Sequence, residues 1–225
     1  MERDGINFIS VKFSREDYLN LNLQVNSNQN KWSKAIEILK DRFYGRYFDV
    51  IENLYVDWSE YKTSRRKRIN YFKVEKNGFT IMAIICLLID AFYQFKYGLE
   101  SSSDLSPLTG RTGVTRNYIE FLKTEFVDVF GQNEEWLADK FYDHIRCGIL
   151  HSAQTKGCSK LAFDRNDVVS AVYENNSTGI RVNIIEFYKK VKKHFGDYVD
   201  SLENGYDIQL RNNFIVKMNY VCGMI

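Results

Sequence analysis

Arg146 and His151 are the two residues of this chain whose types and spacing suggest chemistry on a phosphate group. They bracket the segment Arg-Cys-Gly-Ile-Leu-His, with four residues between them. An arginine carries a permanent positive charge that can neutralise charge developing on a phosphate. A histidine, whose ordinary pKa is about 6.5, can accept or donate a proton near neutral pH. The pair therefore predicts a phosphate site.

One long helix over residues 135–154 is predicted to carry both residues, since its apolar residues recur at intervals of three and four. At about 100° per residue, the Arg146 and His151 side chains would point about 140° apart, so one chain alone would bring them together poorly. Two copies packed antiparallel about a two-fold axis would place Arg146 of one chain near His151 of the other. Gly148 would let the two backbones approach closely. The predicted core-facing stripe is Leu137, Ala138, Phe141, Ile145, Gly148 and Ile149.

Three neighbours on this helix are further candidates. His144 lies seven residues before His151, at nearly the same helical angle, and is predicted to be a second proton-transfer group or a phosphate ligand. Cys147 follows Arg146 directly, which makes a reactive thiol one interpretation of it. Asp143 precedes His144 and is expected, with Cys147, to support the site.

Asp90 is a carboxylate inside an otherwise apolar run, residues 84–92. A buried carboxylate without a partner is costly, so Asp90 is expected to have one. One interpretation is a structural ion pair with Arg42 or Arg46. The other is that Asp90 supports the site by orienting Arg146 from a neighbouring helix.

The string Phe-Tyr-Asp-His-Ile-Arg-Cys-Gly-Ile-Leu-His, which ends at His151, resembles the signature of the HEPN superfamily. That signature is an Arg and a His, four to six residues apart, on a late helix of an all-α bundle. The order of elements is similar too: a helix over 79–95 with Asp90, a linking helix, then the motif helix. The resemblance covers residues 31–222 loosely and residues 135–155 closely.

The resemblance implies a mainly α, HEPN-like bundle with short peripheral strands, acting as a metal-independent endoribonuclease without a cofactor. It further implies a homodimer with a composite site, RNA as substrate, and a role in toxin–antitoxin or antiviral defence, with an antitoxin or defence-system protein as a partner. A ribose 2′-hydroxyl would attack the adjacent phosphate. His151 would transfer protons and Arg146 would stabilise the transition state.

Other interpretations remain open. Some members of that superfamily are non-catalytic and bind RNA, a nucleotide or a partner protein, with the arginine as a clamp. Cys147 favours this alternative, because many active members have Asn, Asp or His at that position. The pair could also serve dimerisation alone, or consist of ordinary solvated residues.

Composition limits the classes of function. With 225 residues, of which 44% are hydrophobic, the chain can bury one substantial core. A net charge of only +2 argues against a protein that coats nucleic acid through its overall charge, so RNA contacts must come from local patches. Charge runs are usually solvated faces, and two are candidates here. The first is Arg65, Arg66, Lys67 and Arg68, and the second is Lys189, Lys190, Lys192, Lys193 and His194.

The four cysteines have no short paired spacing, which predicts neither a zinc site nor a disulfide framework. Cys86 is expected in the core. The N-terminal residues lack an apolar targeting segment, so a cytoplasmic location without membrane contact is expected. The apolar run 79–95 is short for a membrane span and contains Asp90, and it is therefore predicted to be a buried helix.

The chain is predicted to form a single domain over residues 1–225. Residues 1–30 form an N-terminal extension with two short strands, because apolar residues alternate over 6–13 and 19–25. The helical core spans 31–158, a small β-hairpin spans 159–183, and C-terminal helices span 184–225. Helices are expected from Ser33 onward and over 78–98, 115–130, 135–154, 184–202 and 207–221, and strands over 161–163, 168–173 and 180–183.

Overall fold

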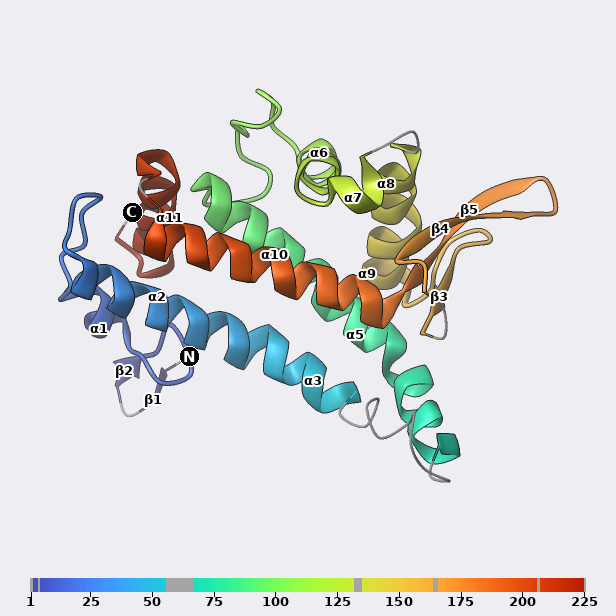
Figure 1. Cartoon of the computed structure of the whole chain (residues 1–225), viewed down its shortest axis with the longest axis horizontal. Helices are drawn as coiled ribbons and strands as arrows, with labels where there is room; N and C mark the ends of the chain where they lie inside the picture. Colours follow the sequence, from blue (N-terminus) through green and yellow to red (C-terminus); the bar gives the residue numbers. More distant parts are fainter. Residues whose placement is uncertain are drawn as a thin grey trace.

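The computed structural model of the chain describes residues 2–3, 5–55, 67–131, 135–163, 166–205 and 207–224. It is mainly α, 63% helical, with a small three-stranded mixed sheet, as predicted. Helix α10 (Ile184–Asn204) packs between α2 (Gln29–Phe43) and α5 (Lys67–Tyr97), and both chain ends lie opposite the sheet (Figure 1). Aromatic rings fill the space between these three helices, with Phe43 stacked on Phe195 at 4.6 Å between ring centroids.

The N-terminal extension differs from the prediction. Strands β1 (Glu2–Arg3) and β2 (Ile6–Asn7) pair antiparallel, but the predicted strand over 19–25 is wrong. Ser14 instead starts a short helix, α1 (Arg15–Leu19). Its side chain accepts from the N–H of Asp17, whose carboxylate accepts in return from the N–H of Ser14. This capping box starts a helix that ends with Leu19. Leu21 N then donates to Tyr18 O and Asn22 N to Leu19 O, so turns rather than a strand follow.

The first long helix begins earlier than predicted, because Asn28 rather than Ser33 caps α2 and accepts from the N–H of Lys31. It continues through a π-helical turn, η1 (Tyr44–Phe48), into α3 (Asp49–Tyr55). Helix α5 also begins before the predicted residue 78. Gly78 lies inside it, where a Cβ would be 3.0 Å from Ile184 Cδ1, so this glycine permits close packing of α5 on α10.

Helix α5 is long and apolar enough to span a membrane over Lys76–Tyr97, by length and composition alone. In the structure, 56% of its most apolar window is buried inside the protein. Its buried side chains, which include Cys86 as predicted, lie at the centre of the core. Such a helix is consistent with the core helix of a folded domain, and it does not by itself locate the protein.

The predicted helix over 115–130 is two helices, α6 (Val114–Glu125) and α7 (Val127–Phe130), separated by Phe126, whose φ of −115° and ψ of 46° are not helical. The motif segment follows as α8 (Trp136–Lys140), a second π-helical turn, η2 (Phe141–Cys147), and α9 (Gly148–Ser152). Helix α6 packs against both α8 and η2.

The predicted hairpin is present as β4 (Val169–Glu174) and β5 (Ser177–Asn183). Asn175 and Asn176 make the two-residue turn with φ values of 48° and 59°, which asparagine tolerates. Strand β3 (Lys160–Ala162) pairs parallel with β5 and completes the sheet. Helices α10 and α11 (Ile208–Val221) close the fold close to the predicted ranges.

Candidate functional site

A π-helical turn lies inside the motif helix and includes Arg146. In η2 the backbone bonds run from residue i to i+5, so each turn contains more residues than an α-helical turn. The rotation per residue is then smaller than 100°, and the angles predicted for an ideal helix do not hold through residues 141–147. The predicted helix is present, but it is wound differently at the motif. π-turns of this kind occur frequently at functional sites.

The apolar side of the motif helix is buried as predicted, and it fixes which side chains face outward. Phe141 and Ile145 are fully buried, and Phe141 packs on Phe187 of α10 at 4.9 Å between ring centroids. Asp143 and His151 are exposed, whereas Arg146 is half-buried. The core therefore holds the helix in place while the polar residues remain at or near the surface.

Arg146 lies over an aromatic ring and has no carboxylate partner. Its Cζ is 5.4 Å from the centre of the Tyr142 ring, a cation–π contact, and its Nη1 donates to Cys147 Sγ over a long 3.9 Å. Among the described residues no carboxylate lies within ion-pair distance of it. Burial lowers the pKa of Arg146, but Cys147, Tyr142 and Tyr118 outweigh this effect and leave that pKa above its ordinary value. The side chain is thus a permanent cation without a carboxylate partner in the part of the chain that the structure describes.

His151 is exposed on the last turn of α9 and has no hydrogen-bond partner among the described residues. The helix ends two residues later at Ala153, whose φ of 52° is in the left-handed region that non-glycine residues seldom adopt. The N–H of Gln154 then donates to Gly148 O at 3.3 Å, a bond that closes the helix terminus. The imidazole of His151 is thus held at a helix terminus and is open to a ligand or a second chain.

Gly148 has a role within the chain that the sequence did not predict. A Cβ there would meet Gln154 O at 2.5 Å and Lys156 N at 3.2 Å. The segment after the helix therefore folds back against the backbone of α9, and only glycine leaves room for it. The close approach that was predicted between two copies is made here by the chain's own loop.

His144 is bound by its own chain, which favours a structural role, and its predicted role in proton transfer or phosphate binding stays a prediction. Its Nδ1 is 2.9 Å from Ser159 Oγ, and its Nε2 is 3.2 Å from Lys140 Nζ. An ammonium group only donates, so Nε2 accepts and the proton of the neutral ring lies on Nδ1. Burial, helped by Lys140 and Lys156, lowers the pKa of His144. Both ring nitrogens of His144 thus have partners in its own chain, and the lowered pKa favours the neutral ring.

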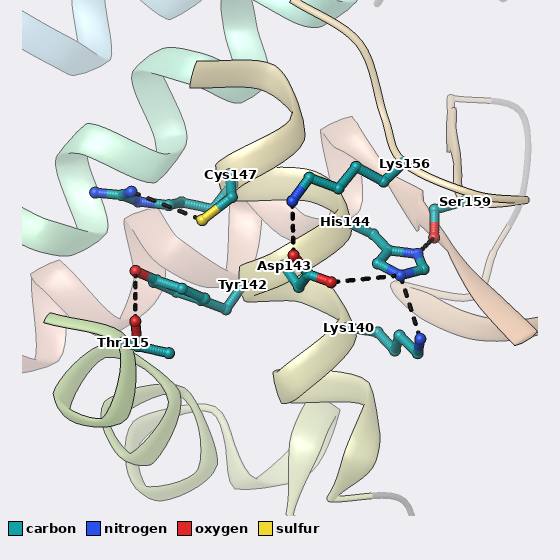
Figure 2. A network of polar contacts seen from close by, with 9 residues as sticks. Thr115, Lys140, Tyr142, Asp143, His144, Cys147, Lys156 and Ser159 are labelled. Carbon is teal, nitrogen blue, oxygen red and sulfur yellow. Dashed lines mark hydrogen bonds and ion pairs between the residues drawn. The ribbon is translucent and has the colours of Figure 1, made fainter. Parts of the chain in front are cut away.

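Figure 2 shows the two flanks of the motif helix. Tyr142 and Cys147 lie on one flank, where Thr115 of α6 donates to Tyr142 Oη at 3.0 Å. His144, Lys140 and Ser159 lie on the opposite flank, toward the sheet. Because Arg146 contacts Tyr142 and Cys147, it shares the flank away from His144. The structure therefore separates Arg146 from His144.

Asp143 is also used within the chain. Its carboxylate accepts from Lys156 Nζ at 2.7 Å and lies 3.7 Å from His144 Nε2. The hydrogen bond from Lys156 lowers the pKa of Asp143. This exposed ion pair, together with the bond from Lys156 N to His144 O at 3.0 Å, ties the loop after α9 back to η2. The Asp143 carboxylate thus helps to hold the loop after α9 in place, and its predicted role in supporting the site stays a prediction.

Asp90 makes neither of the contacts that were predicted for it. Arg42 and Arg46 both donate to Ile9 O, and Asp90 has no ion pair among the described residues. Its Oδ2 accepts from Gln94 at 3.5 Å, while its buried Oδ1 has no partner. Burial raises the pKa of Asp90, and the nearby Ser102 hydroxyl and the charges of Arg146 and Lys217 offset this only in part. The charge of Arg146 thus acts on the Asp90 carboxylate from a distance, without a hydrogen bond or ion pair between the two described side chains.

The structure treats the two basic runs that were predicted as RNA contacts differently, because it describes the side chains of the second run alone. Arg65 and Arg66 lie outside the described residues, and Lys67 and Arg68 begin α5 with side chains that are not described. The second run lies in the middle of α10, not near its end, and each of its lysines has a carboxylate partner. The pairs are Lys189 with Glu186, Lys190 with Asp128, Lys192 with Glu52, and Lys193 with Asp197. This pairing weakens the interpretation of the second run as an RNA surface.

The cysteines are all free, and Cys147, half-buried beside Arg146, is the one nearest the motif arginine. In the described part of the chain, no group of three or more His, Cys, Asp or Glu side chains is placed to hold a metal ion.

Four residues that the sequence did not single out shape this site. Tyr142 lies four residues before Arg146, and Lys140 lies four residues before His144, which is the spacing of helix neighbours. That spacing could have identified both. Thr115 and Ser159 come from other segments, and no local spacing points to them.

Comparisons of the chain with protein-family models, with curated proteins and with solved structures found no match.

Proposed function

We propose that this protein is a HEPN-like, metal-independent endoribonuclease that acts as a homodimer. The observation that carries the proposal is the difference between the polar residues of the motif helix. His144 and Asp143 are bound by their own chain, whereas Arg146 has no carboxylate partner and His151 has no hydrogen-bond partner among the described residues. The two residues that the HEPN-like motif marks for chemistry are the two left available for an external ligand.

The proposed reaction begins with removal of the proton from a ribose 2′-hydroxyl, which then attacks the adjacent phosphorus. The bond to the 5′-oxygen of the next nucleotide breaks, and that oxygen takes up a proton. The products are a 2′,3′-cyclic phosphate and a 5′-hydroxyl end. A two-fold dimer supplies two copies of His151, so that one can act as the base and the other as the acid. Arg146 neutralises the charge on the non-bridging phosphate oxygens.

The test is cleavage of labelled single-stranded RNA, and of DNA of the same sequence, in excess EDTA. The wild type is expected to cut RNA but not DNA, which lacks the attacking hydroxyl. Arg146→Ala and His151→Ala are each expected to lower the rate by at least about 100-fold. Lys189→Ala is the matched control, because it removes an exposed, paired cation from α10.

A folded wild-type protein that leaves RNA intact between pH 6 and 8, or that cuts DNA equally well, would contradict the nuclease proposal. Size-exclusion measurements on the same variants separate catalysis from assembly. If Arg146→Ala or His151→Ala converts dimer to monomer and the loss of cleavage follows the loss of dimer, the residues serve dimerisation instead.

A further inference from the structure

A cavity of about 690 Å³ lies beside α6 and α8, and one of its lining residues, Thr115, lies next to Tyr142 in Figure 2. It is formed by the loop that precedes α6, by α6 itself and by α8. Thr115 lines this cavity and also donates to Tyr142 Oη, and the Tyr142 ring in turn supports the Arg146 guanidinium. The lining residues are Leu108, Thr109, Arg111, Thr115, Arg116, Ile119, Glu120, Lys123 and Asp139.

The charges in this cavity divide into two ends. At one end Lys123 is 3.5 Å from Asp139, 3.7 Å from Glu135 and 3.9 Å from Glu120, so its charge is offset by these carboxylates and this end carries no free cation. At the other end, Arg111 and Arg116 are exposed, and neither side chain has a hydrogen bond or an ion pair within the described ranges. The second end therefore presents two unpaired guanidinium groups.

The loop that carries Arg111 is anchored to α6. Buried Asn117 donates to Ser102 O at 3.2 Å and to Asp104 O at 3.1 Å, and accepts from Thr109 Oγ1 at 2.7 Å. These bonds hold the loop against the helix that carries Arg116. Both arginines are thus presented from a fixed scaffold, which lowers the entropic cost of binding a ligand.

We propose that this cavity binds the sugar–phosphate backbone of the RNA strand, with Arg111 and Arg116 on phosphates that flank the one at Arg146. The inference rests on the proposed function and extends it to the path of the substrate. Guanidinium groups bind phosphate oxygens with two parallel hydrogen bonds, and a polyanionic strand needs several such cations. Arg111 and Arg116 share the cavity with Thr115, which bonds to the tyrosine whose ring supports Arg146. Contacts of this kind position a strand without reading its sequence.

The experiment measures binding of a short fluorescent single strand of 2′-O-methyl RNA, which lacks the attacking hydroxyl and is not cut. Arg111→Gln and Arg116→Gln are each expected to raise the Kd about tenfold, and the double variant that carries both changes is expected to raise it further. The slope of log Kd against log salt is expected to fall by about 0.7 for each phosphate that the variant no longer neutralises. The matched control is Lys189→Gln with Lys193→Gln, which also removes two positive charges but from paired, exposed positions on α10. Thermal melting checks that each variant is folded.

Unchanged binding in the Arg111→Gln/Arg116→Gln variant, or an equal loss in the control variant, would overturn the inference. So would a wild type that fails to bind the strand, or one from which polyglutamate displaces the strand at an equal concentration of charge, since the cavity would then be a general anion surface. Cleavage of unmodified RNA is measured separately. An enzyme that cuts RNA but binds equally well without the two arginines keeps the proposed function and loses this inference.

Discussion

The two π-helical turns in the described structure each contain an arginine, and they use it in opposite ways. In η1, Arg46 Nη2 donates to Ile9 O at 3.0 Å, and Arg42, on the turn before, donates to the same carbonyl. In η2, the polar and ring contacts of Arg146 among the described residues are with the Tyr142 ring and Cys147 Sγ. One arginine joins the N-terminal extension to the helical body, while the other is left unpaired.

The difference between the two arginines indicates two roles that a π-turn can have, one in stability and one in binding. A π-turn is rarer than an α-turn and requires compensation from its surroundings. In η1 the compensation is structural, since the turn also buries Phe48 against Phe195 at 5.2 Å between ring centroids. In η2 the inward residues are equally buried, but the outward arginine gains no carboxylate partner in the described chain. An unpaired cation on a rare helical turn is more easily explained by a ligand than by stability.

The largest expected effect comes from replacing the arginine of each π-turn by alanine and comparing the two variants. Arg146→Ala should lower RNA cleavage by at least about 100-fold and leave the free energy of unfolding within about 0.5 kcal/mol. Arg46→Ala should lower the free energy of unfolding by about 1 kcal/mol, because Arg42 still donates to Ile9 O, and change cleavage less than Arg146→Ala does. Urea denaturation and initial cleavage rates measure the two quantities on the same samples.

Arg42→Ala combined with Arg46→Ala sharpens this comparison, since Ile9 O then has no donor from either side chain, and the loss should grow to about 3 kcal/mol. The comparison between the turns breaks if Arg146→Ala destabilises the protein as much as Arg46→Ala does. Arg146 would then be a second structural arginine.

The sequence predicted the helical body and the inward stripe of the motif helix because both follow from apolar spacing. Phe141 and Ile145 are four residues apart and both are fully buried. It did not predict η2, because a π-turn arises from competition between local backbone bonds and packing, which no spacing reports. The strand wrongly predicted over 19–25 shows the same limit, because the first residue of that segment already belongs to α1, the helix that the bonds between Ser14 and Asp17 start.

For the candidate site, the sequence supplied residue types but not partners. Arg146 and His151 were identified by residue type and by the HEPN-like pattern, and their role stays a prediction. His144 was given the same role, but Ser159, fifteen residues later, binds its ring from the segment that folds back over Gly148. The orphan oxygen of Asp90 likewise depends on where Arg42 and Arg46 point, which only the tertiary structure decides.

The three histidines differ in burial, since His144 and His194 are partly buried and His151 is exposed. The burial of the first two predicts a pH effect on stability. Burial lowers the pKa of His144 and of His194 below 6.5. The unfolded chain then binds more protons than the folded one as the pH falls below about 6.5, so stability decreases in that direction and is greatest above it. Melting temperatures between pH 7.5 and 5.5 should show this loss.

His144→Gln should make that pH dependence shallower and lower the melting temperature at pH 7.5, because Ser159 and Lys140 lose a well-placed ring. The expected cost is about 1–2 kcal/mol in the free energy of unfolding. Cleavage by the protein that remains folded should be within tenfold of the wild type. A loss of cleavage as large as that of His151→Ala would place His144 in the chemistry and remove the distinction between the two flanks.

The smallest effect is expected at Asp90, which tests whether its field positions Arg146. Because burial raises the pKa of Asp90 above 3.8, the folded state binds more protons than the unfolded chain between those two pKa values. Stability therefore falls as the pH rises through that window, and the loss is complete at neutral pH. Asp90→Asn, which removes the charge, should raise the free energy of unfolding at pH 7 by up to about 1 kcal/mol, and urea denaturation at pH 7 and pH 4 should show the gain shrinking toward acid.

The same variant measures what the carboxylate contributes to the site. Asp90 does not touch Arg146, so Asp90→Asn should change cleavage by less than tenfold, and Asp90→Leu, which also removes the bond to Gln94, provides the comparison for packing. If Asp90→Asn gains stability but loses cleavage as severely as Arg146→Ala, then Asp90 is a positioning residue kept at a cost in stability. In that case the position of Arg146 in η2 would depend on a distant carboxylate as well as on its own turn. Arg46 and Arg146 would then differ in how far away their partner lies, since Arg46 contacts Ile9 O directly, and no longer in whether they have a partner at all.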